Sequence, residues 1–160
     1  MADTIKVGKR LRRWLDDQNY RYSFDPEDGE CRGSWNVDCS LKSVQLIFRP
    51  YSNAFMVLGV CKRNADPENY GRIVEYLTRA NYGLSNGCFE FDHRDGEIRY
   101  RAYHIMNNDN DDPGSITDDV IKRMYLITLN MFERYGNGIT ALLDGNSSPA
   151  EEIQKAESSN

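Results

Sequence analysis

Residues that could bind a metal ion or transfer protons are thinly spread along this chain. The densest acidic cluster is Asp109, Asp111 and Asp112, whose spacing invites comparison with a calcium-binding loop. The EF-hand pattern fails there, because Pro113 stands where the fifth loop position takes Asp or Asn. Val120 also occupies the position of the bidentate Glu. We therefore expect a solvated acidic loop and no metal site.

The two histidines, His93 and His104, are too far apart along the chain to form a site. In the hairpin predicted below, the strand rise of about 3.3 Å per residue places them beyond the reach of one metal ion. The adjacent carboxylates at 16–17 and 118–119 point in different directions around their helices. No nucleotide-binding, hydrolase or metalloprotease motif is present. We expect no catalytic residue and no cofactor, and hence no enzyme.

The four cysteines are separated by 8, 22 and 27 residues, and none forms the C-x-x-C pair that structural zinc sites use: Cys31, Cys39, Cys61 and Cys88. We expect four reduced thiols, some of them small core residues. One disulfide or an adventitious metal site is the alternative.

The composition predicts one soluble domain without a membrane span. The chain has 160 residues and a net charge of −5, and 39% of its residues are hydrophobic. It contains no apolar run of about 18 residues and no secretory signal pattern, so we expect a cytoplasmic protein. A pI near 5.1 disfavours general binding of nucleic acids. Residues 146–160 form a polar tail that we expect to be disordered, after a single domain over 1–145.

Hydrophobic periodicity predicts a helix over 4–18, then three or four strands, a helix from Asp66-Pro67, a hairpin, and a long helix capped at Thr117. We expect Gly136 and Gly138 to end that last helix. Basic residues cover much of the first helix, and we interpret them as a solvated face in preference to a contact for RNA, lipid or an acidic partner: Lys6, Lys9, Arg10, Arg12 and Arg13.

The run Ala54–Cys61 is almost continuously apolar, which is typical of a central strand covered on both faces or of a strand that meets a partner. On one face lie Met56, Leu58 and Val60, which we predict to contact a partner. The alternate residues, Phe55, Val57 and Gly59, would then face the helices, although the pattern alone also permits the two faces to be exchanged.

The stretch from Leu77 to His104 predicts the end of a helix followed by a β-hairpin. Strict alternation assigns four residues to its buried face: Phe89, Phe91, Tyr100 and Ala102. A two-residue loop at Asp95-Gly96 would set Asp92 against Arg99 and Glu90 against Arg101. A longer loop would set Asp92 against Glu97, which repels, so we prefer the two-residue loop.

This same stretch resembles the YbjN family. The resemblance rests on a helix ending in L-x-x-A-N (Leu77 to Asn81), a G-x-F strand start (Gly87 to Phe89) and the D-G-E-I-R-Y return (Asp95 to Tyr100). It follows the order of elements over roughly Thr4 to Gly145, and it implies a bacterial protein with the fold of type III secretion chaperones.

Pattern and resemblance together predict an α+β fold in the order α-β-β-β-α-β-β-α. An antiparallel sheet of about five strands would pack against three helices. Without a reaction centre, we expect an interaction module, chaperone-like or regulatory, that binds a polypeptide and forms a homodimer, as the secretion chaperones do. A small-molecule-sensing regulatory domain is the alternative, and binding of nucleic acid through the first helix is a third.

Overall fold

A computed structural model describes residues 2–106 and 116–158 of the chain. The acidic cluster at 109–112 lies outside these residues. The helices are α1 (Ala2–Asp17), the 3-10 helix η1 (Pro67–Asn69), α2 (Tyr70–Asn81), α3 (Asp118–Leu143) and α4 (Pro149–Ser158). The strands are β1 (Ser23–Phe24), β2 (Cys31–Asn36), β3 (Ser43–Pro50), β4 (Ala54–Cys61), β5 (Cys88–Phe91) and β6 (Ile98–Ile105).

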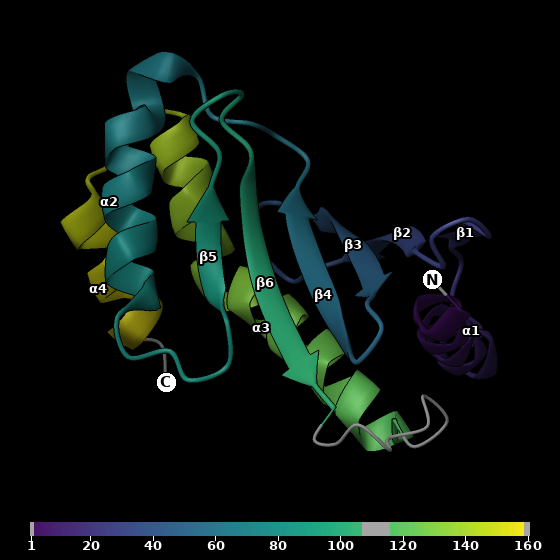
Figure 1. Cartoon of the computed structure of the whole chain (residues 1–160). Helices are drawn as coiled ribbons and strands as arrows, with labels where there is room; N and C mark the ends of the chain where they lie inside the picture. The colour runs from purple at the N-terminus through teal and green to yellow at the C-terminus, as the bar shows by residue number, and fades with distance from the viewer. Residues whose placement is uncertain (1, 107–115, 159–160) are drawn as a thin grey trace.

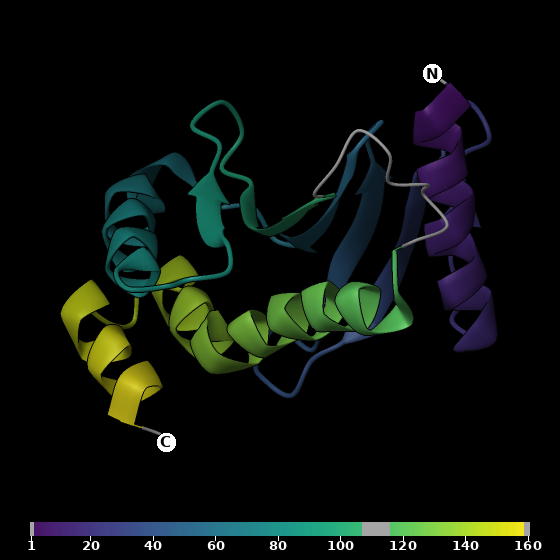
Figure 2. The ribbon, with the colours of Figure 1, turned by 60° about the horizontal axis from the view of Figure 1, so that its bottom comes forward.

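The strands form one antiparallel sheet in the order β1-β2-β3-β4-β6-β5. The predicted α+β class is confirmed, with six strands and four α-helices in the described residues where about five and three were expected. The helices gather on one side of the sheet, so that Figure 1 views the strands from their helix-free side. In Figure 2, α3 runs beneath the sheet from the α2 end towards α1.

The alternation along β4 decides which side chains meet the helices. Phe55 and Val57 belong to the main hydrophobic core, and a Cβ on Gly59 would stand 2.4 Å from the ring of Phe132 in α3. Met56 and Leu58 point the other way and belong to a separate, smaller cluster. Of the two face assignments that the pattern permitted, the structure therefore has the one we preferred.

The long helix α3 does not end at its two glycines, contrary to the prediction. Gly136 and Gly138 lie within α3, which continues to Leu143. Added Cβ atoms there would lie 2.5 Å from the sulfur of Cys39 and 2.2 Å from the hydroxyl of Tyr76. These glycines are needed because neighbouring side chains approach the helix backbone closely, and not because the chain turns.

The polar tail contains α4, where the sequence predicted disorder. Ser148 and Glu151 form a capping box, in which each backbone N–H donates to the other residue's side chain over 3.3–3.4 Å. Glu152 is 5% exposed, and Ile153 packs against the main core. The S-x-x-E signal was present in the sequence, but the low hydrophobicity of the tail concealed it.

The hairpin of β5 and β6 is shifted by two residues from the predicted register. Glu90 pairs with Arg99 instead of Arg101, and Asp92 stands opposite Glu97 across the turn. A shift of two residues leaves every side chain on its predicted face. The shared face of Phe89, Phe91, Tyr100 and Ala102 therefore holds, and the residues that directly face each other change; Glu90 still forms an ion pair with Arg101, now diagonally, at 3.0 Å.

The turn tolerates the two facing carboxylates because each has its own arginine. Asp92 accepts a hydrogen bond of 2.6 Å from Arg94, and Glu97 lies 3.6 Å from Arg99. The charge argument for a two-residue loop fails because it takes no account of these arginines. Gly96 adopts φ +77°, and its carbonyl accepts from the N–H of Ala65 at 2.9 Å.

Candidate functional site

The helix-free face of the sheet, named here the open face, has an apolar centre. Ile47, Met56 and Leu58 form a hydrophobic cluster of their own, with Val60 packed against it. These three side chains are only 7%, 9% and 2% exposed. Because the helices lie on the opposite side, long side chains from neighbouring strands must provide this cover. The apolar centre is thus a floor beneath a layer of polar side chains.

Residues that pair across neighbouring strands form rows on the open face. The central row contains, in order, Arg32, Ile47, Leu58, Arg101 and Cys88. An arginine from β2 and an arginine from β6 therefore flank the two aliphatic residues.

The neighbouring rows repeat this arrangement in part. In the row through Met56, Arg49 lies on one side and Tyr103 on the other. In the row through Val60, Arg99 lies on the β6 side. The apolar centre consequently has arginines on both of its flanks.

On the β2 side, the arginines are held by a buried carboxylate. Glu30 is 3% exposed and accepts hydrogen bonds from Arg32 and, at 2.5 Å, from Arg49. Hydrogen bonding to this carboxylate raises the pKa of Arg49, although burial of the guanidinium acts as the larger, opposing influence. Two cations share one anion, so this cluster has a net positive charge.

On the β6 side, a second cluster has the same composition. Glu90 accepts from Arg99 at 2.7 Å and lies 3.0 Å from Nε of Arg101. The side chains of these two arginines remain 39% and 42% exposed. These four guanidinium groups face three carboxylates, those of Glu30, Glu90 and Glu97, so the open face keeps an excess of positive charge in a protein whose net charge is −5.

Two exposed tyrosines stand at one end of the open face. The rings of Tyr51 and Tyr103 meet edge to face, with centroids 6.0 Å apart. They are 37% and 45% exposed. Tyrosine side chains, which combine an apolar ring with a polar hydroxyl, are common where proteins bind other proteins.

The other residues considered in the sequence are not brought together. The ring of His93 packs on Phe91 in the turn, whereas His104 packs on Phe55 and has its pKa lowered by burial. All four cysteines are free thiols. Within 2–106 and 116–158, no three His, Cys, Asp or Glu side chains gather closely enough to bind a metal ion.

The basic face of α1 is partly used within the protein. Arg10 donates to the carbonyl of Ile116 at 2.8 Å and to the carboxylate of Asp118. Arg12 stacks on Phe24, with its guanidinium carbon 4.9 Å from the ring centroid. These contacts favour the interpretation of a solvated, structural helix face. Of the helices in the described parts of the chain, none combines the length and the hydrophobicity needed to cross a bilayer.

The arginines of the open face could not be identified as functional candidates from the sequence. The alternating pattern indicates that Arg99 and Arg101 face acidic residues, but it does not align β6 with β4. Only that alignment places Arg101 beside Leu58 and Tyr103 beside Met56. A search for cationic residues at the predicted outward positions of every strand would have found them.

Comparison with known proteins gives one family. A family model described as "YbjN: Putative bacterial sensory transduction regulator" matches residues 8–141. Among solved structures, the chain is similar to that of YbjN from E. coli, described as "a putative transcription regulator". The two chains are 11% identical, the match covers 86% of this chain and 90% of the other, and the TM-score is 0.54. At this identity the likeness shows the fold alone. No curated protein sequence matches the chain.

Proposed function

The chain belongs to the YbjN family, whose model is described as a "Putative bacterial sensory transduction regulator", and we propose that it is a regulatory module that acts by binding a polypeptide. It carries out no reaction of its own. The binding surface is the open face, and the partner segment carries carboxylates on either side of an apolar residue.

One observation carries this proposal: the open face combines an apolar floor with an excess of positive charge in an acidic protein. Such complementarity selects an acidic partner and accelerates its association. The same charge disfavours face-to-face pairing of two copies of this chain. The expected homodimer stays a prediction, and light scattering of the purified protein measures its mass directly.

The residues predicted for partner contact, Met56, Leu58 and Val60, have a modified role in this proposal. The first two are almost covered, so the partner first meets arginine and tyrosine side chains. It reaches the aliphatic floor only where those flexible side chains move aside. Arginine and tyrosine are also the residue types that dominate binding energy at many interfaces.

The small-molecule alternative has weaker support. A ligand pocket is a concave, mostly apolar cavity with a few converging polar groups. The depression between α3 and α4, in contrast, is open and lined by Glu133, Arg134 and Asn137 among other polar residues.

The experiment removes charge from the open face without removing its structure. In the double variant Arg32→Gln and Arg101→Gln, each buried or half-buried carboxylate keeps one arginine partner. The matched control, Arg13→Gln with Arg123→Gln, changes the net charge equally at exposed positions on α1 and α3. The probe is a fluorescein-labelled helical peptide of glutamate and leucine, followed by anisotropy.

We expect the open-face variant to bind the probe about tenfold more weakly, which corresponds to roughly 1.4 kcal/mol. Binding to the wild type should weaken as salt is added. An equal loss in both variants would contradict the proposal, because it would show only a response to net charge. Tighter binding of single-stranded RNA than of the peptide would instead favour a nucleic-acid function.

A further inference from the structure

Each of the two outermost strands has a feature that limits the addition of a further strand. At one edge, β1 is only two residues long. At the other, the side-chain amide of Asn81 covers β5: it accepts from the N–H of Phe89 at 2.7 Å and donates to the carbonyl of Phe89 at 2.9 Å. Natural sheets commonly block edges in such ways, because an unpaired edge recruits other strands.

The edge of β6 lacks this protection over half its length. Pairing with β5 ends at Cys88, opposite Arg101, whereas pairing with β4 continues to Ile105. Among the described residues, 102–105 therefore have a strand neighbour on the β4 side only. Figure 1 shows β6 continuing beyond the start of β5 with no strand beside it on that side.

The direction of the main-chain groups along this edge follows from the pattern of β5. The side chain of Asn81 forms hydrogen bonds with the N–H and the carbonyl of Phe89, so these two groups point away from β6. By alternation along the strand, the N–H and carbonyl of Cys88 point towards β6. Arg101, opposite Cys88, therefore points its main-chain groups towards β5. By alternation, Tyr103 and Ile105 point theirs in the same direction, beyond the end of β5.

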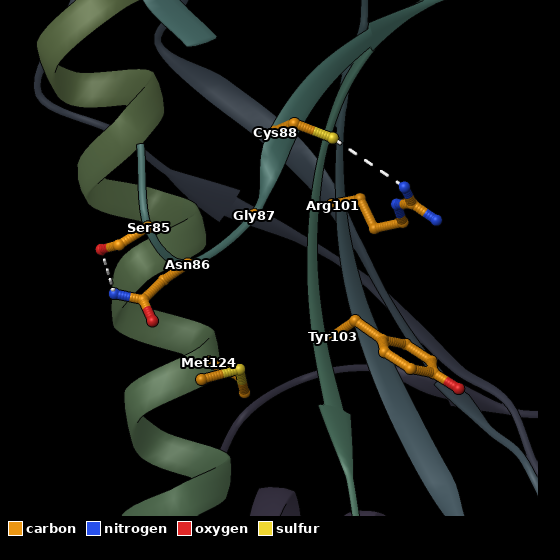
Figure 3. Close-up of a pocket in the computed structure, with 7 residues that line it drawn as sticks. All are labelled: Ser85, Asn86, Gly87, Cys88, Arg101, Tyr103 and Met124. Atoms are coloured by element: carbon orange, nitrogen blue, oxygen red, sulfur yellow. Dashed lines mark hydrogen bonds between the residues drawn. The ribbon is translucent and has the colours of Figure 1, made fainter. Parts of the chain in front are cut away.

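A hollow lies beside this unpaired stretch. It measures about 290 Å³ and is bordered by the loop at 85–87, by β6 and by Met124 of α3. In Figure 3, Arg101 and Tyr103 project to one side of the strand, whereas Met124 lies on the other side. Tyr103 and Ile105 are 45% and 57% exposed.

We propose that the free edge of β6, residues 102–105, binds an extended segment of a partner polypeptide as an added strand in line with β5. Alternate side chains of that segment fall on opposite sides of the sheet. On one side a carboxylate would meet the guanidinium of Arg101, and on the other an apolar side chain would meet Met124. The site rests on the proposed function only in that its ligand is a polypeptide, since main-chain hydrogen bonds provide the contact.

Amide hydrogen exchange of the full ¹⁵N-labelled chain tests the first step. In the free protein, we expect the amides of Tyr103 and Ile105 to exchange at least tenfold faster than those of Ala102 and His104, which pair with β4. The probe is an acetylated hexapeptide of alternating glutamate and leucine. Its addition should slow exchange at Tyr103 and Ile105 at least tenfold, and a version N-methylated at each glutamate, whose N–H points towards β6 in this arrangement, should not.

A pair of variants tests the second step. Tyr103→Pro removes an N–H that points away from β4, and proline is tolerated at such edge positions. Tyr103→Phe keeps the N–H and the ring. We expect the phenylalanine variant to bind the hexapeptide as the wild type does, and the proline variant to bind it at least tenfold more weakly. Thermal unfolding reports whether each variant folds.

Three results would overturn the strand-addition site. The first is slow exchange of Tyr103 and Ile105 in the free protein at all concentrations. The second is protection that grows with protein concentration without peptide, which would mean that a second copy occupies the edge. The third is equal hexapeptide binding by a folded proline variant and the wild type. If helical-peptide binding still depends on Arg32 and Arg101 in that case, the open-face proposal stands and the strand-addition site alone fails.

Discussion

Replacing Asn81 by alanine should both destabilise the protein and open the edge of β5. The substitution removes two hydrogen bonds, one to the N–H and one to the carbonyl of Phe89. Each contributes roughly 0.5–1.5 kcal/mol net, which gives a loss of about 1–3 kcal/mol. Alanine is the better helix former, by roughly 0.5 kcal/mol, and this offsets a small part of the loss at the last residue of α2.

The change can be measured in three ways on one pair of proteins. Urea unfolding gives the free energy of unfolding, and the melting temperature should fall by about 2–4 °C for each kcal/mol lost. Hydrogen exchange of the Phe89 amide should accelerate, because its acceptor is gone. Light scattering at high concentration should show more association in Asn81→Ala than in the wild type, since a new strand edge is exposed.

Asn86→Ala is the matched control for this substitution. Asn86 is exposed, and its side-chain amide donates only to the hydroxyl of the neighbouring Ser85. The control should therefore keep the wild-type stability and the wild-type exchange rate at Phe89. If Asn81→Ala behaved like this control, the amide of Asn81 would not be what protects β5, and the contrast between the two edges would lose its basis.

Three further changes have defined outcomes. Gly59→Val should cost about 1–3 kcal/mol in urea unfolding, because its Cβ would stand 2.4 Å from the ring of Phe132. Iodoacetamide should label Cys88 first, and mass mapping would show this. The other three thiols are buried, and burial raises their pKa, that of Cys31 to about 12. Cys88→Ser should remove the early label. Burial lowers the pKa of His104 below 6.5. The free energy of unfolding should therefore be highest above pH 6.5 and fall as the pH drops from 6.5 through the lowered pKa of the folded protein. His104→Gln should flatten this pH dependence of the melting temperature.

Alternation in the sequence predicted the faces of strands better than it predicted their alignment. The alternation along Ala54–Cys61 correctly assigned one set of residues to the core and the other to the helix-free side of the sheet, because a single period-two pattern determines both sets. The hairpin register failed because it was chosen from the charges of facing residues alone. Asp92 pairs within its own turn with Arg94, so its position opposite Glu97 carries little penalty.

The end of α3 and the C-terminal tail were mispredicted because glycine and polarity were interpreted locally, whereas the end of α2 at Asn81 was predicted correctly. Gly136 and Gly138 resemble a helix end in sequence, yet they accommodate neighbouring side chains of Cys39 and Tyr76. That role depends on tertiary contacts between residues far apart in the chain, which no local pattern reveals. The open face was missed for the same reason: it exists only once five strands are aligned side by side.

The segment that carries the family resemblance also creates the free edge. Asn81 covers β5, and Gly87 adopts φ +133° with its Cα so close to Arg101 that a Cβ would stand 2.2 Å from that residue's carbonyl oxygen. The chain therefore enters the sheet at Cys88, and β5 has four residues where β6 has eight. An unpaired stretch of β6 is a direct consequence of this difference in length. The same short motif thus protects one edge of the sheet and leaves the next strand open to a partner, so the scaffold and the proposed binding site depend on the same residues.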